Sequence, residues 1–213
     1  PAAAPGWHVI GNGRLATRIR TDGASGLNWQ THALTRLDPA AHGAGYSIFL
    51  RDRSEGRFWA ATGDPAPVDG EEGQTVFHAH QAEFHRRAHG ISATTTICVA
   101  QGDDLEIRRI ALVNETDQPR SLDITSYADV VLAPPLDAAR HPAFSKLFVG
   151  AETIPGGAGL LFTRRPRGAA ERSPVLLHRM IAEDEGVRLL GVTANRRAFL
   201  GRHGSVSDPA AMH

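Results

Sequence analysis

Short segments in which hydrophobic and polar residues alternate recur along most of the chain. Successive side chains of an extended strand point to opposite faces, so this alternation predicts strands that are buried on one side. Other segments are rich in β-branched residues, which favour strands. The segments expected to form strands are Arg14–Arg20, Tyr46–Arg51, Arg57–Ala61, Gln74–His80, Ala82–Arg87, Ile91–Ala100, Leu105–Val113, Ser121–Leu132, Ser145–Val149, Gly159–Thr163, Val175–Ile181 and Val187–Val192.

Residues typical of turns separate these segments at short spacing. Asp52–Gly56 has the composition of a hairpin turn, and Gly102–Asp104 and Asn114–Pro119 follow other strand candidates. No long stretch shows the 3.6-residue period of a helix, and the best short helix, Leu136–Arg140, is limited by Pro142. The pattern therefore predicts an all-β fold, an antiparallel sandwich or barrel with at most short helices.

Composition narrows the classes of function. The 213 residues are 41% hydrophobic and 22% charged, which is typical of a globular chain with its own core. Lys+Arg and Asp+Glu both number 23, so a chain-wide basic surface for nucleic acid is excluded. Cys98 is the single cysteine, so no internal disulfide framework is expected. The sequence shows no signal peptide and no apolar run near the roughly 20 residues that span a bilayer, so we expect a soluble chain.

Eleven histidines raise the question of a metal site. His78 and His80 are two residues apart and would share one face of a strand, where they could chelate an ion. No acidic or cysteine residue stands at a known zinc-ligand spacing, which favours an exposed strand instead. We expect neither a metal nor a cofactor.

The residues offer no clear catalytic group. His141, Ser145 and Lys146 lie close in sequence, but adjacent residues of a strand point to opposite faces, which weakens a Ser–Lys dyad and favours a structural corner. Acidic clusters fall in predicted turns, and no pair is suited to glycoside hydrolysis. Arginine doublets such as Arg108–Arg109 leave phosphate binding and sheet packing both open. Catalytic residues are therefore predicted to be absent.

Aromatic residues suggest carbohydrate contact as an alternative. Trp29, Trp59, Tyr46 and Tyr127 could stack on sugar rings, although aromatic residues make up only 6% of the chain. Trp29 follows a glycine-rich segment and is expected to be the most exposed of them, whereas Trp59 is expected to pack in a core.

Several blocks, in order along the chain, resemble the N-terminal β-supersandwich domain of glycoside hydrolase family 94, formerly glycosyltransferase family 36. The likeness is greatest to the first such domain of the cyclic β-1,2-glucan synthases, and it covers about Gly11 to Ala211. The most specific block is His141–Val149. The other blocks include Asn12–Arg14, Gly23–Gly26, Ala33–Arg36, Tyr46–Asp52, Ala82–Arg87, Glu106–Arg109, Leu122–Ala128, Val130–Pro134, Thr163–Pro166, Arg196–Arg202 and Asp208–Ala211.

This resemblance implies a galactose-mutarotase-like sandwich over residues 7–211, as one piece of a much longer chain. In the family the sandwich precedes an (α/α)₆ barrel that carries the general acid and the phosphate site, borders the active-site cleft and contributes to subunit contacts. It implies a non-catalytic accessory domain that supports glucan synthesis or chain-length control. The adjacent catalytic domain, a β-glucan and a second copy are the expected partners. The parent would be membrane-anchored, on the cytoplasmic side of a bacterial inner membrane. The carbohydrate-contact candidates are Trp29, Trp59, Tyr46, His141 and Lys146.

Two other functions stay open at this stage. One is a stand-alone carbohydrate-binding module that uses Trp29 or Trp59. The other is a complete mutarotase-like enzyme, for which His78, His80 and His141 are the available histidines.

Overall fold

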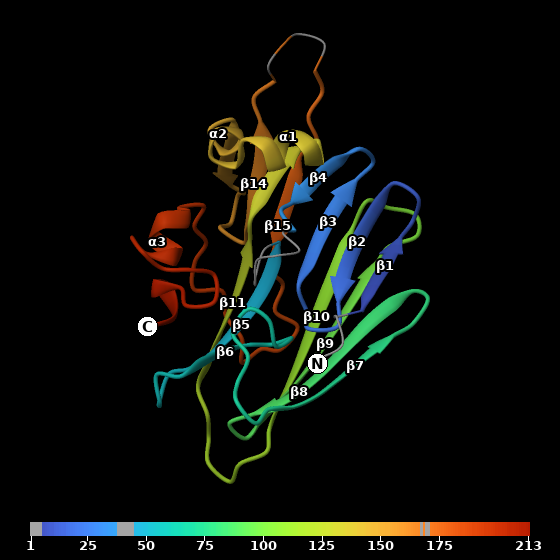
Figure 1. The fold of residues 1–213 in the computed structure, drawn as a ribbon. Helices are drawn as coiled ribbons and strands as arrows, with labels where there is room; N and C mark the ends of the chain where they lie inside the picture. Colours follow the sequence, from blue (N-terminus) through green and yellow to red (C-terminus); the bar gives the residue numbers. More distant parts are fainter. Residues whose placement is uncertain (1–5, 38–44, 167, 169–170) are drawn as a thin grey trace.

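The computed structural model describes residues 6–37, 45–166, 168 and 171–213, and its antiparallel strands confirm the all-β prediction (Figure 1). The strands are β1 (Trp7–Gly11), β2 (Leu15–Arg20), β3 (Ser25–Trp29), β4 (His32–Thr35), β5 (Tyr46–Asp52), β6 (Phe58–Ala60), β7 (Glu72–Phe77), β8 (Gln81–Ala88), β9 (Ile91–Val99), β10 (Glu106–Asn114), β11 (Leu122–Ala128), β12 (Val130–Ala133), β13 (Val149–Thr153), β14 (Gly159–Arg164) and β15 (Leu176–Arg179). The helices are α1 (Pro135–Arg140), α2 (Pro142–Lys146) and α3 (Arg196–Leu200), with a final 3-10 turn at Ala210–Met212. Within the described ranges, no helix has the length and apolar character that a bilayer crossing requires.

The strands of the described residues form four sheets that pack on one another. Their orders are β1-β2-β3-β4-β12, β10-β9-β8-β7, β11-β5-β6 and β13-β14-β15. Ile19 of β2 packs with Phe84 of β8 and Ile97 of β9, so the first sheet covers the second. A further core lies between the third sheet and β9. Leu50 and Trp59 of the third sheet pack there with Ile91 of β9. The layers therefore enclose several adjoining apolar cores.

Strand β8 shows how the sequence pattern sets this packing. Its residues alternate between exposed or half-buried and fully buried, and Ala82, Phe84 and Ala88 all face the core. Arg86 shares that buried face, where its guanidinium donates to the carbonyl oxygens of Thr62 (3.1 Å) and Gln74 (2.9 Å). A buried charge is tolerated here because neighbouring backbone oxygens satisfy its donors.

The expected single strand Ser121–Leu132 is two strands in different sheets. Asp129 separates them: its N–H donates to the carbonyl of Gly45 (2.8 Å), and its own carbonyl accepts from the N–H of Arg36 (2.8 Å). The first bond continues the pairing of β11 with β5, and the second begins that of β12 with β4. Leu132 then has a φ of 51°, beside the irregular pairing of β12. The hydrophobic pattern runs through this junction because β11 is half-buried and β12 is buried.

Other boundaries also differ from the prediction. The expected strand Ser145–Val149 begins instead with α2, because Pro142 at its first turn favours helical φ and needs no hydrogen-bonded N–H. Leu136–Arg140 is helical as expected, within α1. Val187–Val192 was expected to be a strand and is not one. Strands β1, β3 and β4 lie in segments without a clear alternating pattern, and their pairing within the first sheet defines them.

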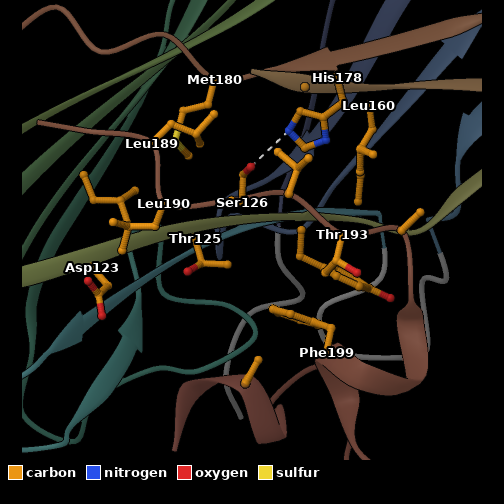
Figure 2. A pocket seen from close by; sticks show the side chains of 18 of the residues that line it. Asp123, Thr125, Ser126, Leu160, His178, Met180, Leu189, Leu190, Thr193 and Phe199 are labelled. Atoms are coloured by element: carbon orange, nitrogen blue, oxygen red, sulfur yellow. Dashed lines mark hydrogen bonds between the residues drawn. The ribbon is translucent and has the colours of Figure 1, made fainter. Parts of the chain in front are cut away.

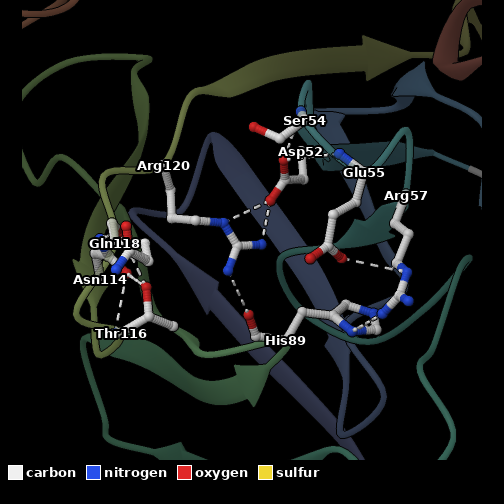
Figure 3. A network of polar contacts seen from close by, with 9 residues as sticks. All are labelled: Asp52, Ser54, Glu55, Arg57, His89, Asn114, Thr116, Gln118 and Arg120. Carbon is white, nitrogen blue, oxygen red and sulfur yellow. Dashed lines mark hydrogen bonds and ion pairs between the residues drawn. The ribbon is translucent and has the colours of Figure 1, made fainter.

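One buried ion pair joins three turns, which lie between β5 and β6, between β8 and β9, and between β10 and β11 (Figure 3). The Asp52 carboxylate accepts from the backbone N–H of Ser54 (2.7 Å) in the β5–β6 turn and from the Arg120 guanidinium, whose Nε lies 2.8 Å away. Arg120 also donates to the carbonyl of His89 (3.2 Å) in the β8–β9 turn. His89 and Gly90 have φ values of 52° and 75°, as a two-residue hairpin turn requires. Asp52 therefore holds together one end of two packed sheets.

Candidate functional site

A cleft of about 1060 Å³ runs along β11 (Figure 2). One wall is β11 itself, and another is formed by inward-facing residues of β14 and β15. A third is the segment 186–195, together with Arg196 at the start of α3. The walls are largely apolar, and polar groups lie at the floor and at both ends. The apolar residues include Leu122, Ile124, Leu160, Phe162, Met180, Leu189 and Leu190. Such a cavity is large enough for a small ligand.

A group of polar side chains from different sheets forms the cleft floor. His178 of β15 points at β11, where its Nε2 lies 3.0 Å from Ser126 Oγ (Figure 2) and 3.3 Å from Tyr46 Oη. Behind them the Arg108 guanidinium lies over the Tyr46 ring, 3.9 Å from its centre, and donates to Glu106 Oε1 (2.7 Å). The floor thus presents one hydroxyl and one imidazole that are held in place by groups farther inside.

The surroundings keep the floor uncharged near neutral pH. Burial, and then the positive charge of Arg108, lower the pKa of His178. Burial also raises the pKa of Tyr46, an effect that Arg108 opposes. A neutral imidazole can both accept and donate one hydrogen bond, so His178 and Ser126 suit a ligand that carries hydroxyl groups.

The lowered pKa of His178 predicts a loss of stability in mild acid. As the pH falls below the ordinary histidine pKa of about 6.5, the unfolded chain binds a proton at this position before the folded chain does. The free energy of unfolding should therefore decrease from that pH down to the lowered pKa, and His178→Gln should remove this part of the decrease. Urea denaturation across this pH range measures it. His203→Gln, at an exposed position, should follow the unsubstituted chain; the same pH dependence in both variants would contradict the assignment.

An ion-paired group closes one end of the cleft. Lys146 Nζ lies 2.8 Å from Asp129 Oδ1, and Arg36 Nε lies 3.7 Å from the other oxygen of that carboxylate. Burial lowers the pKa of Lys146, although Asp129 opposes this. Arg196 lies at the same end, near Tyr127. The negative charge of Asp129 is thus balanced by neighbouring cations.

The five carbohydrate-contact candidates do not come together. Lys146 lines the cleft, and Tyr46 supports its floor. His141 is exposed at the junction of α1 and α2 and is not among the cleft-lining residues. Trp29 lies elsewhere, at the end of β3, where its Nε1–H donates to Asp104 Oδ2 (2.7 Å). That bond is the main reason that the pKa of Asp104 is lowered.

Trp59 lies in the core, with a relative exposure of 1%. Its ring contacts that of His89 edge-on at 5.2 Å and packs with Leu50 and Ile91. A side chain enclosed in this way is closed to a sugar, so Trp59 is a structural residue in this fold.

The histidines considered for metal binding lie outside the cleft. The rings of His78 and His80 are 6.2 Å apart, and His78 Nε2 lies 3.7 Å from Glu83. His85 Nε2 lies 3.3 Å from the same carboxylate. The described ranges contain no cluster of three or more metal-ligating side chains suited to an ion.

His178 and Ser126 were not singled out by the sequence reasoning, although a signal for each was present. In β15 the position of His178 alternates with outward-facing residues, so it shares the inner face with Leu176. Ser126 shares the face of Ile124 in β11. A polar residue at an inward position of a strand needs a partner, and that requirement could have marked both.

Comparison with known proteins identifies the family. The model of the glycosyl hydrolase 94 supersandwich domain matches residues 1–213. The chain belongs to this family. It is 30% identical over 205 residues, 95% of its length, to the cyclic beta-(1,2)-glucan synthase NdvB of Rhizobium meliloti (strain 1021). It is also 29% and 26% identical, over 134 residues, to the N,N'-diacetylchitobiose phosphorylases of Vibrio furnissii and Vibrio proteolyticus.

These relatives are much longer polypeptides. The supersandwich chain spans 7% of the glucan synthase and 17% of each phosphorylase, and the phosphorylase matches cover 59% of the chain. The family resemblance read from the ordered sequence blocks is thus confirmed, as is the antiparallel supersandwich fold.

Proposed function

We propose that this chain is a non-catalytic accessory domain of a glucan-synthesising enzyme, in which it supports glucan synthesis or chain-length control by an adjacent (α/α)₆ barrel. The observation that carries the proposal is the match of 95% of the chain to 7% of a cyclic beta-(1,2)-glucan synthase. A second copy of the enzyme and a membrane-anchored parent, with this domain on the cytoplasmic side, belong to the same proposal.

The charges in the cleft support a role in binding over one in glycoside cleavage. Inverting and retaining enzymes need two carboxyl groups that face each other across the sugar. Among the described residues that line the cleft, the carboxylates are Asp123 and Asp129. Asp129 is paired with Lys146, and Asp123 lies 3.9 Å from Arg53. Both carboxylates are therefore engaged with neighbouring cations.

The non-catalytic role predicts that the isolated chain leaves glucan intact. Incubation with β-1,2-glucan and inorganic phosphate should release no glucose 1-phosphate above that of a heat-inactivated control. Release that scales with the concentration of folded chain would refute the accessory assignment.

We further propose that the cleft contacts the glucan through its floor. Ser126 and His178 offer neutral hydrogen-bonding groups beside apolar walls, which fits the hydroxyl groups and C–H faces of glucose. Removing one such hydrogen bond by Ser126→Ala should weaken the binding of a β-1,2-linked glucose oligosaccharide by about 2–10-fold, as measured by calorimetry. Thr163→Ala, on the exposed face of β14, should leave the affinity unchanged; equal losses in both variants would argue against the cleft.

A stand-alone carbohydrate-binding module is the second candidate function, because Trp29 is partly exposed. It predicts that Trp29→Ala weakens oligosaccharide binding more than Ser126→Ala does. Trp fluorescence during the same titrations distinguishes binding at Trp29 from binding in the cleft.

A further inference from the structure

Among the described residues, no strand pairs with the outer edge of β11. In the sheet order β11-β5-β6, β11 is a border strand with β5 as its one neighbour. The pairing register opposes Leu122 to Asp52 and Ala128 to Tyr46. An exposed strand edge presents free N–H and carbonyl groups to any segment that can pair with it.

The register also shows which backbone groups face outward. Asp129 N–H bonds Gly45, and Arg53 N–H bonds Ser121, so the odd-numbered residues of this strand pair with β5. In an antiparallel pair the residues between them direct their N–H and carbonyl groups to the opposite edge. The outward groups are therefore those of Leu122, Ile124, Ser126 and Ala128.

The segment Val187–Val192 lies on another wall of the same cleft. Its apolar side chains are poorly covered, with relative exposures of 47% for Val187, 40% for Leu189 and 67% for Leu190. The Val187 N–H donates to the carbonyl of Asp184 (3.0 Å) in the preceding loop. Within the described residues, the backbone of the segment makes no hydrogen bond to a strand. Its sequence is nevertheless typical of a strand.

We propose that Val187–Val192 docks on the outer edge of β11 as a parallel fourth strand and closes the cleft over Ser126 and His178. The parallel direction follows from the helix after the segment. The Phe199 ring of α3 stacks on that of Tyr127, 4.8 Å between ring centres, near the C-terminal end of β11. Docking would satisfy the outward backbone groups of β11 and cover apolar side chains that are now exposed. The segment thus regulates access to the cleft, and its docking does not depend on which ligand the cleft binds.

Amide hydrogen exchange followed by NMR on the whole chain tests this docking without a ligand. The amides of Ile124 and Ser126 should exchange about tenfold or more slowly than amides of exposed loops, because only the docked segment protects them. The amides of Thr125 and Tyr127, bonded to β5, serve as internal controls. Exchange of Ile124 and Ser126 at the rate of exposed loops would overturn the proposal.

Two proline variants identify the protecting segment. Leu189→Pro and Leu190→Pro each remove one N–H, and neighbouring residues of a strand direct these groups to opposite edges. One variant should therefore lower the protection of Ile124 and Ser126 about tenfold and the other much less, with Thr125 and Tyr127 unchanged in both. Protection that neither proline alters, or that disappears when the chain is diluted, would assign the β11 edge to a different partner and contradict the proposal.

Discussion

Replacing Asp52 by alanine is expected to lower the free energy of unfolding by about 3–5 kcal/mol, the cost of breaking a buried ion pair from one side. The Asp52 side chain has no exposed surface and that of Arg120 is 12% exposed, so the substitution leaves a guanidinium buried without its carboxylate. The turn N–H groups of Ser54 and Glu55 lose their acceptor as well. Urea denaturation at neutral pH measures the change.

Asp123→Ala provides the matched control. Asp123 lies 3.9 Å from Arg53, whose side chain is 57% exposed, and such a pair contributes less than about 1 kcal/mol. Similar destabilisation by Asp52→Ala and Asp123→Ala would show that Asp52 does not join the turns as inferred.

The same carboxylate should make the chain sensitive to strong acid. Hydrogen bonds from Arg120, above all, lower the pKa of Asp52. The unfolded chain then binds a proton at this carboxyl at a higher pH than the folded chain does. The stability that Asp52 contributes is fully present above the ordinary aspartate pKa of about 3.9 and is lost as the pH falls toward the lowered value.

Trp59→Ala is expected to destabilise the chain by about 3–5 kcal/mol, because it removes a large side chain from a packed core. Trp59→Phe keeps part of that volume and should cost less, which provides a measurement if the alanine variant fails to fold. Trp7→Ala changes a tryptophan that is 41% exposed and should have a much smaller effect. Denaturation of the three variants compares them. A nearly neutral Trp59→Ala with weakened oligosaccharide binding would contradict the core assignment.

The strand pattern could be predicted wherever one face of a strand is buried and the other is exposed to solvent. Leu15–Arg20 and Gln81–Ala88 are such strands, and their alternation is visible in the sequence. The division at Asp129 could not be predicted, since it depends on backbone bonds to Gly45 and Arg36 from distant segments. The strand character of Val187–Val192 was overestimated because pattern alone does not supply a neighbouring strand.

The cleft was harder to predict than the fold. Lys146 was found through its place in the most specific sequence block, and it does line the cleft. His178 and Ser126 are 52 positions apart, and only the packing of two sheets brings them together. Trp29 and Trp59 were chosen as aromatic residues, yet one bonds Asp104 and the other fills a core. Residue type identified groups able to bind sugar but not the surface that they share.

One NMR titration tests most directly whether this supersandwich chain contacts glucan without breaking it. A β-1,2-linked glucose oligosaccharide is added in the presence of inorganic phosphate, and the backbone amides and the sugar signals are followed together. We expect millimolar sugar to shift the amides of Ser126, His178 and Thr193, while the sugar spectrum stays constant. New anomeric signals of glucose 1-phosphate, or shifts confined to the surroundings of Trp29, would contradict the account.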